Sequence, residues 1–318
     1  MSAEPHRAAA IANSDLFLCG LRVRSTLPLP ELAPWTGDDR EPDLVIRTGA
    51  IPARLDGAHD MSPLLQITPQ MQARLSIDGV ATYWLRSSEE IIIDPQIAAD
   101  RPDVRIFLFG TILGLLSHRR GLFPLHASCV RIGGNAVAIA GISGAGKSTL
   151  ATALTRRGHA LLSDDVCVID PAAADGPAVL PAFPRVKLWQ DSLEAMGIGS
   201  HGLAANRPGQ HKYHFYLAEA ANFEPSALPL KKIYLLSPSN APLAGRNEIE
   251  KLAPTSAISG LHQQIYRKRT AAEWGLEPGL FKSLGTIVGA AEIYHLTRSP
   301  DLADLAMMVQ RFEAHAAS

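Results

Sequence analysis

The chain has 318 residues, of which 47% are hydrophobic and 19% are charged. This composition supports a folded core and excludes wholesale disorder, and the length suits one large or two medium domains. The formal net charge of −1 argues against a nucleic acid as the main partner.

Three features of the chain concern its compartment. Cys19, Cys129 and Cys167 show neither a CxxC spacing nor histidine-rich surroundings, so we expect no disulfide framework and no zinc site. Residues 1–20 lack a basic start followed by a clean apolar run, so we predict no signal peptide. The apolar run 106–116 is too short for a bilayer, which requires about 20 residues. We therefore expect a cytoplasmic protein without a membrane partner.

Residues 1–102 are predicted to form a strand-rich N-terminal domain. Short apolar or alternating runs are broken there by Pro, Gly and Asp, a pattern typical of several short strands with turns. These runs are LFLCGLRV, DLVIRTG, ARLSIDGVATYWLRS and EIIIDP. Because the region offers no nucleophile constellation, we expect it to support the fold or to recognise substrate.

Residues 103–318 are predicted to form the catalytic domain, beginning with a helix over 104–118. Two strand-like runs follow, Ala127–Ile132 and Asn135–Ala140, and two glycines join them. A Gly-Gly connection is a strong hairpin signal, because both central residues need a positive φ. The hairpin leads directly into a glycine-rich loop.

Beyond that loop, strands and helices are expected to alternate. A helix over 147–157 should stop at Gly158, which suits a left-handed C-terminal cap. The next strand, 160–169, carries two aspartates in its middle. Further strands are expected at 231–236 and 291–296, helices at 256–267 and 302–314, and a strand end followed by a helix at 185–196. The alternation predicts an α/β domain with a mixed sheet.

The glycine-rich loop is a phosphate-binding motif. It matches GxxxxGK[ST] in full and lies between a predicted strand and a predicted helix, the context that the motif requires. Backbone N–H groups of such a loop and of the helix N-terminus bind phosphates. We expect Lys147 to reach the β- and γ-phosphates of ATP and Ser148 to bind Mg²⁺. The predicted nucleotide-binding residues are Gly141, Ser143, Gly144, Ala145, Gly146, Lys147, Ser148 and Thr149.

Asp164 and Asp165 lie inside an apolar run, where carboxylates are costly to bury without partners. Strand alternation points them to opposite sides, so that one can face the nucleotide while the other contacts an arginine or the metal. His126 opens the hairpin, and a histidine beside an aspartate can orient it or share its proton. The sequence does not choose among the cations that could neutralise the transferring phosphoryl group, which are Arg185, Lys187, Lys212, Arg267 and Arg269.

The spacing of the acids narrows the class of phosphate-loop protein. Asp164 follows Lys147 by 17 residues, which is one helix and part of a strand. The chain has no NKxD element for guanine, and its only LSGGQ-like stretch, ISGLHQQ, follows the acids instead of preceding them. An acid one strand after the loop favours a kinase. A small-molecule kinase and a nucleotide-binding regulator without catalysis remain as alternatives.

In combination, these motifs resemble the catalytic domain of HPr kinase/phosphorylase. That family has a histidine 15 residues before the first loop glycine, a GxSGxGKS loop, a helix ending in RGH, a short apolar run and a DD pair. Here these are His126, 141–148, 157–159, 160–163 and 164–165. The pattern LHAS…GxSGAGKSTL…RRGHxLLSDD is closer to the HPr-kinase-like enzymes encoded with lasso-peptide genes, which resemble serine kinases of a precursor peptide.

The resemblance implies a fold related to phosphoenolpyruvate carboxykinase, ATP and Mg²⁺ as cofactors, and a serine of a peptide or small protein as acceptor. It implies Asp164 as the base, His126 as its partner and Lys147 as the phosphate ligand, with Asp165 completing the catalytic set. Ser148 and Asp165 are the implied metal-binding residues.

The chain also departs from that family. Thr149 stands where the family has a glutamate, and PRVKLWQDSLEAMG occupies the region of the downstream signature with its metal-binding glutamate. HPr itself is therefore kept as an alternative acceptor beside a lasso precursor peptide. The sequence leaves a homo-oligomer open.

Overall fold

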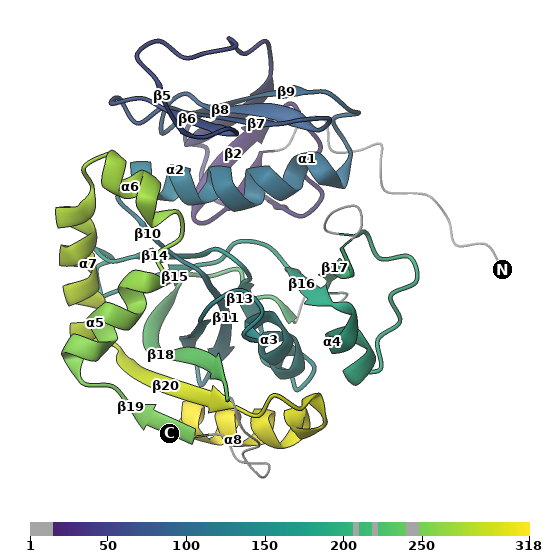
Figure 1. Cartoon of the computed structure of the whole chain (residues 1–318), viewed down its shortest axis with the longest axis vertical. Helices are drawn as coiled ribbons and strands as arrows, with labels where there is room; N and C mark the ends of the chain where they lie inside the picture. The colour runs from purple at the N-terminus through teal and green to yellow at the C-terminus, as the bar shows by residue number, and fades with distance from the viewer. Residues whose placement is uncertain (1–14, 206–209, 218–221, 240–247) are drawn as a thin grey trace. The chain divides into compact units, whose positions relative to one another are not determined.

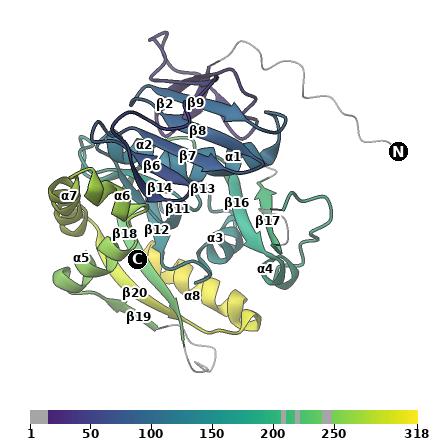
Figure 2. The ribbon, with the colours of Figure 1, turned by 45° about the horizontal axis from the view of Figure 1, so that its top comes forward.

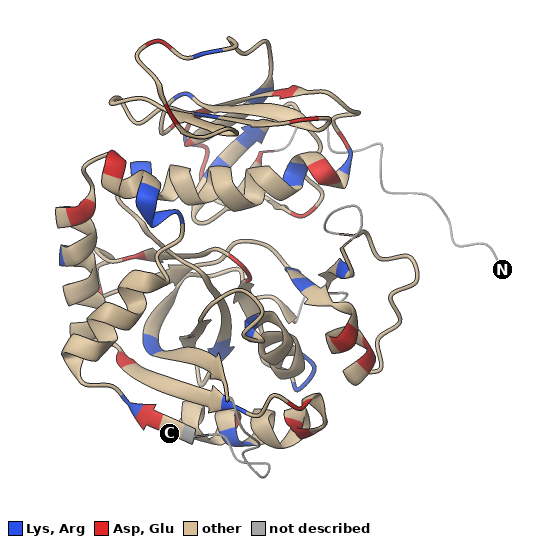
Figure 3. Cartoon of the chain, in the orientation of Figure 1, with Lys and Arg blue, Asp and Glu red and all other residues tan. Residues whose placement is uncertain are grey.

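The computed structural model describes residues 15–205, 210–217, 222–239 and 248–318 (Figure 1). It divides into two compact units, Met1–Leu108 and Phe109–Ser318. Lysines and arginines are interspersed with acids along both units (Figure 3), which agrees with the net charge of −1. Within the described residues, no helix combines the length and apolarity needed to cross a membrane.

The N-terminal unit is built on a nine-stranded sheet with the order β3-β1-β2-β4-β9-β8-β7-β6-β5. Figure 2 shows its strands β7, β8 and β9 side by side. The pairs β2–β4 and β4–β9 are parallel, and the others are antiparallel. The predicted strand-rich N-terminal region is confirmed. Its elements are β1 (Leu16–Leu18), β2 (Leu21–Ser25), β3 (Ala33–Pro34), β4 (Leu44–Thr48), β5 (His59–Ser62), β6 (Leu65–Ile67), β7 (Ala73–Ile77), β8 (Ala81–Leu85), β9 (Glu90–Pro95) and α1 (Pro102–Phe107).

The C-terminal unit contains a mixed sheet, as predicted for an α/β domain. Its strand order is β10-β14-β15-β18-β12-β11-β13, and β18 also pairs with β20, which pairs with β19. The pairs β12–β18 and β18–β20 are parallel. The strands are β10 (Phe123–Leu125), β11 (Ala127–Ile132), β12 (Asn135–Ala140), β13 (Leu161–Ser163), β14 (Cys167–Asp170), β15 (Ala178–Leu180), β18 (Leu228–Pro238), β19 (Glu248–Lys251) and β20 (Glu292–Arg298); β16 (Arg185–Trp189) and β17 (Lys212–Tyr216) form a separate two-stranded ribbon.

Helices cover both faces of this sheet, because its central strands are apolar on both sides. On β12, Ala138 faces a core that includes α5 and α7, whereas Val137 and Ile139 face a core that includes α3 and α8. Full burial on both faces is typical of parallel strands. The helices are α2 (Leu113–Arg119), α3 (Lys147–Thr155), α4 (Gln190–Ala195), α5 (Pro254–Gln263), α6 (Lys268–Glu273), α7 (Glu277–Ala290) and α8 (Leu305–Ala317), with a π-helix η1 (Leu108–Ile112) and a 3-10 helix η3 (Leu302–Asp304).

The hairpin before the glycine-rich loop is confirmed. Strands β11 and β12 pair from Ile132 opposite Asn135 to Ala127 opposite Ala140. The two connecting glycines have φ values of 56° and 79°, the left-handed conformation that the Gly-Gly dipeptide predicted.

The continuous strand predicted over 160–169 is wrong. Strand β13 ends at Ser163 and pairs with β11, whereas β14 begins at Cys167 and pairs with β10 and β15. The chain changes partner strands between them, and Asp165 takes a φ of 73° in the connection. An aspartate adopts this conformation more readily than a β-branched residue does. The aspartates therefore occupy a break between strands instead of a strand centre.

The helix expected over 256–267 also ends early. Helix α5 stops at Gln263, since Ile265 forms a bridge with Leu125 and Arg267 has a φ of 54°. Helix α7 was not predicted, and three glycines inside its Glu277–Ala290 sequence weaken the helical pattern there.

Candidate active site

The glycine-rich loop joins β12 to α3 and folds around the ammonium group of Lys147. Its Nζ donates to the carbonyl oxygens of Gly141 at 2.8 Å and Ile142 at 3.0 Å, and lies 3.1 Å from Nε2 of His126. An ammonium has only protons to donate, so Nε2 is the acceptor and the other ring nitrogen carries the proton. His126 Nδ1 therefore donates to the backbone oxygen of Asp165, at 2.9 Å.

Helix α3 begins directly after Gly146, which has a φ of 103°. A Cβ at Gly146 would also lie 2.9 Å from Nε of Arg298, so only glycine fits this position without strain. The first N–H groups of an α-helix have no acceptor within the helix, which leaves them available to phosphate oxygens.

Asp164 is buried and is held by three donors. Its Oδ1 accepts from the hydroxyls of Ser128 at 2.6 Å and Ser148 at 2.8 Å, and its Oδ2 accepts from the backbone N–H of Lys187 at 2.9 Å. These bonds compensate for the burial of its charge. The contact with the loop serine is the arrangement that holds a metal-binding acid beside a phosphate loop.

Asp165 faces the cavity in front of the loop. Its carboxylate lies 2.8 Å from Lys187 Nζ and 3.4 Å from His126 Nδ1. Burial alone would raise its pKa, but attraction to the Lys187 ammonium outweighs burial and holds the pKa below its usual range. Asp165 lines the cavity, whereas Asp164 is held by three donors and accepts from Lys187 only through its backbone N–H. The two aspartates lie at a break between strands, where Asp165 has a positive φ, so regular strand alternation does not set their directions.

Burial also lowers the pKa of the two basic groups beside the loop, Lys147 and His126. It lowers the pKa of Lys147 to about 8, against the opposing attraction of Asp164 and Asp165. Burial, followed by repulsion from Lys147, lowers the pKa of His126. The resting site thus combines a neutral imidazole with a lysine that loses its proton unusually easily.

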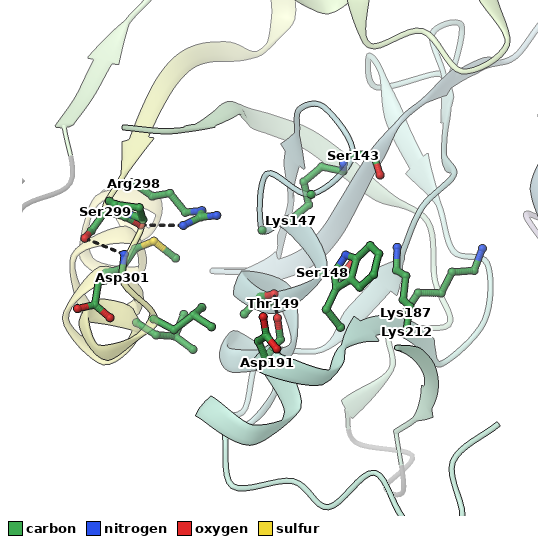
Figure 4. A pocket seen from close by; sticks show the side chains of 18 of the residues that line it. Ser143, Lys147, Ser148, Thr149, Lys187, Asp191, Lys212, Arg298, Ser299 and Asp301 are labelled. Atoms are coloured by element: carbon green, nitrogen blue, oxygen red, sulfur yellow. Dashed lines mark hydrogen bonds between the residues drawn. The ribbon is translucent and has the colours of Figure 1, made fainter. Parts of the chain in front are cut away.

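These residues line a cavity of about 280 Å³ in the C-terminal unit (Figure 4). The loop contributes Ser143, Gly144 and Gly146, and the first turn of α3 contributes Lys147, Ser148 and Thr149. The remaining lining residues come from five other places in the chain, namely the residue before β11, the β13–β14 connection, the β16–β17 ribbon, the start of α4, and the segment from the end of β20 into α8.

Two predicted loop residues have structural contacts of their own. Ala145 is buried, and its carbonyl oxygen accepts from Arg298 at 2.6 Å. Thr149 is buried, and its hydroxyl lies 2.8 Å from that of Ser192 at the start of α4. Both contacts attach the loop and α3 to later parts of the chain.

Of the five cations proposed from the sequence, two line the cavity and three do not. Lys187 and Lys212 line the cavity. Arg185 instead packs over the rings of Phe109 and Phe183. The other two also lie apart from the lining residues: Arg267 donates to the Thr111 hydroxyl, and Arg269 lines a separate groove among α5, α6 and α7.

Sequence reasoning missed Arg298 and Ser128. Arg298 closes β20, and the predicted strand stopped two residues short of it. The parallel pairing of β20 with β18, and of β18 with β12, brings their carboxyl ends to the edge where ligands bind in such sheets. Ser128 could have been found as the hydroxyl two residues beyond His126, on the same strand face.

The residues present fit a Mg²⁺ ion that arrives with phosphates. The Ser148 hydroxyl and the Asp164 carboxylate are oxygen ligands of the kind this ion prefers, and it takes one or two carboxylates together with substrate phosphates. Within the described ranges, this site included, no cluster of three or more His, Cys, Asp or Glu is arranged to hold a metal by itself, so the phosphates would have to complete the set of ligands.

Comparison with known proteins agrees with this geometry. Residues 122–200 match the family model of the HPr serine kinase C-terminal domain. This segment is HPr kinase-like. A curated HPr kinase/phosphorylase from Chlorobium phaeobacteroides is 37% identical over 125 residues, which span 36% of this chain and 38% of the relative. The HPr kinase-like segment contains the loop, both aspartates and Lys187, whereas Lys212 and Arg298 lie outside it.

A solved HPr(Ser) kinase/phosphatase from Coxiella burnetii shows a weaker likeness. It is 13% identical, with a TM-score of 0.31, and the match covers 61% of this chain and 99% of that one. At this score the likeness carries no argument about the site.

Proposed function

We propose that the chain is an ATP-dependent kinase that transfers the γ-phosphoryl group to a serine hydroxyl of a peptide or small protein in the cytoplasm. The observation that carries the proposal is the position of Asp165, a carboxylate that lines the same cavity as Lys147 and is paired with Lys187. The match to an HPr kinase domain supports the same reaction class.

In the proposed mechanism, Lys147 leaves the carbonyl oxygens that hold it and binds the phosphates. Ser148 and Asp164 would hold Mg²⁺, which neutralises charge on the phosphates when bound. Asp165, oriented by His126 and Lys187, receives the proton of the acceptor hydroxyl as the new O–P bond forms and ADP departs. The cations around the cavity stabilise the charge on the transferring group.

This mechanism exchanges the roles that the family resemblance implied for the two aspartates. Asp164 has three donors on its carboxylate, one of them from Ser148, and is almost fully buried. Asp165 is the one that lines the cavity. We therefore propose Asp165 as the base and Asp164 as the metal ligand, with the reverse order as the competing assignment.

We propose a lasso precursor peptide as the acceptor. The combined LHAS, loop and SDD pattern of the sequence supports it. HPr is the second candidate, because the matched relative is named HPr kinase/phosphorylase.

The decisive experiment is transfer of label from [γ-³²P]ATP to each acceptor, with serine-to-alanine acceptors as negative controls. Lys147→Ala should abolish transfer, whereas Asp175→Asn, in an exposed loop, should leave it unchanged. Tight ATP binding without transfer to either acceptor would overturn the kinase proposal.

The same assay separates the aspartates. Asp165→Asn should lower the transfer rate while leaving Mg²⁺-dependent ATP binding intact. We expect the unaltered chain to bind ATP more tightly with Mg²⁺ than with EDTA. In Asp164→Asn this difference in ATP affinity should disappear. If Asp164→Asn instead keeps the Mg²⁺-dependent increase in ATP affinity and only its transfer rate falls, the exchanged assignment of the two aspartates is wrong.

A further inference from the structure

The cavity differs in chemistry from one end to the other. Arg298 and Asp301 lie on one side of Lys147 and Ser148, and Lys187 lies on the other, together with Lys212 (Figure 4). Any nucleotide bound to the loop must therefore place its base toward one side and its γ-phosphate toward the other. Which side holds which group decides the residues that act on the transferring phosphoryl group.

Asp165 and its partner Lys187 indicate the side of the γ-phosphate. Lys187 belongs to the β16–β17 ribbon, where Trp189 pairs directly with Lys212 across the two strands. The Lys212 ammonium lies 5.5 Å from the Trp189 ring centre and attracts the Asp165 carboxylate at longer range, whereas the direct ion pair of that carboxylate is with Lys187. Lys187 is already paired with Asp165 at 2.8 Å. Lys212 is thus the cation on this side that is available to a phosphate.

The opposite side suits a nucleoside and disfavours phosphate. Leu302, Leu305 and Met308 line it, so a flat base can bury apolar surface there. Asp301 and Asp304 also line this side. Their carboxylates would repel a phosphate chain, whereas they can accept hydrogen bonds from ribose hydroxyls and base N–H groups.

Arg298 connects this nucleoside side to the loop. Its Nε donates to Ala145 O at 2.6 Å, and its Nη1 donates to Ser299 O at 2.7 Å. The described partners of its guanidinium are therefore backbone oxygens. This anchoring holds the segment after β20 against the phosphate-binding loop, so both ends of a nucleotide can be bound at once.

We propose that the base and ribose bind between the segment after β20 and the first turn of α8, so that the phosphate chain runs past Lys147 toward Lys212. Lys212 then stabilises the transferring phosphoryl group, and Leu302 and Leu305 form the wall of the nucleoside subsite. This orientation rests on the proposed function and assigns residues outside the HPr kinase-like segment to both tasks.

The test is calorimetric binding to the full chain without acceptor, using ADP, ATP and inorganic tripolyphosphate as probes. Replacing Leu302 and Leu305 together by Ala should weaken ADP about tenfold and leave tripolyphosphate unchanged. Met307→Ala is the matched control, since Met307 lies on α8, is 43% exposed and does not line the cavity. Lys212→Ala should weaken ATP more than ADP.

Comparing the probes also reveals misfolding, because an unfolded variant would lose binding of all three ligands. Equal losses of ADP and tripolyphosphate in the double variant, with its circular dichroism spectrum retained, would overturn the subsite. Equal losses of ADP and ATP in Lys212→Ala would overturn the orientation. If the unaltered chain binds none of the three probes, the proposed function itself fails.

Discussion

Raising the pH from 7 to 9 should weaken nucleotide binding through a single group, Lys147. Burial in the loop lowers the pKa of this lysine to about 8, so it loses its proton within this interval. The pKa of neighbouring His126 is also lowered, so the imidazole stays neutral throughout. The terminal phosphate of ADP ionises near pH 6, below the interval, so its charge stays constant as well.

The expected magnitude follows from the protonated fraction of Lys147. With a pKa of about 8, about 90% of the lysine is charged at pH 7 and about 10% at pH 9, which lowers the apparent affinity about tenfold, or by about 1.4 kcal/mol. An exposed lysine with a pKa near 10.4 would lose only about 4% of its charge by pH 9.

Calorimetric titration with ADP at half-unit pH steps measures this profile. Lys147→Arg is the matched variant, because a guanidinium stays charged throughout and should give a flat profile even if its affinity is lower. A flat profile for the unaltered chain up to pH 9 would refute the inference that burial dominates at Lys147.

Stability of the unliganded protein gives an independent check. Between pH of about 8 and about 10.4 the unfolded chain retains a proton on this lysine that the folded state has lost. Stability relative to Lys147→Met should therefore rise with pH across this window, by an amount on the order of 3 kcal/mol. Urea unfolding of both proteins at several pH values measures the difference.

Four further substitutions test the packing of the two units. Gly146→Ala should destabilise the protein and prevent nucleotide binding, because of its φ of 103°, whereas Gly285→Ala, exposed on α7, should stabilise it by about 1 kcal/mol in thermal unfolding. Ser128→Ala removes a 2.6 Å bond to Asp164 and should lower the free energy of unfolding by about 1 to 3 kcal/mol in urea. Arg105→Met removes the 2.8 Å ion pair with buried Glu31 and should lower this free energy by about 3 to 5 kcal/mol; a loss under 1 kcal/mol in urea unfolding would contradict this.

The sequence predictions that the structure confirmed depend on residues that are close together in the chain. The Gly-Gly turn, the two strands beside it and the start of α3 depend on residues within one hairpin and one helical turn. Backbone conformation there follows from glycine, strand and helix preferences that act over a few residues. The C-terminal alternation of strands and helices was predicted for the same reason.

The break at the two aspartates could not be predicted in this way. Apolar neighbours favoured an uninterrupted strand, but β13 and β14 have different partner strands that lie far away in the sequence. Ser128, 36 residues earlier, donates a hydrogen bond that offsets part of the cost of burying the Asp164 carboxylate. Propensity yields to such tertiary contacts.

The sequence alone determined that a glycine-rich loop follows a hairpin, and that a lysine, a serine, two acids and a histidine lie within 40 residues of one another. Only the tertiary structure decided how they divide their contacts, with Asp164 held by Ser148 and Asp165 facing the cavity. It also brought Lys212 and Arg298 to that cavity. The physical reason is that strand pairing, parallel at β20 and antiparallel in the β16–β17 ribbon, joins residues distant in sequence. Side-chain direction at a strand break also depends on a backbone angle that neighbouring residues do not set.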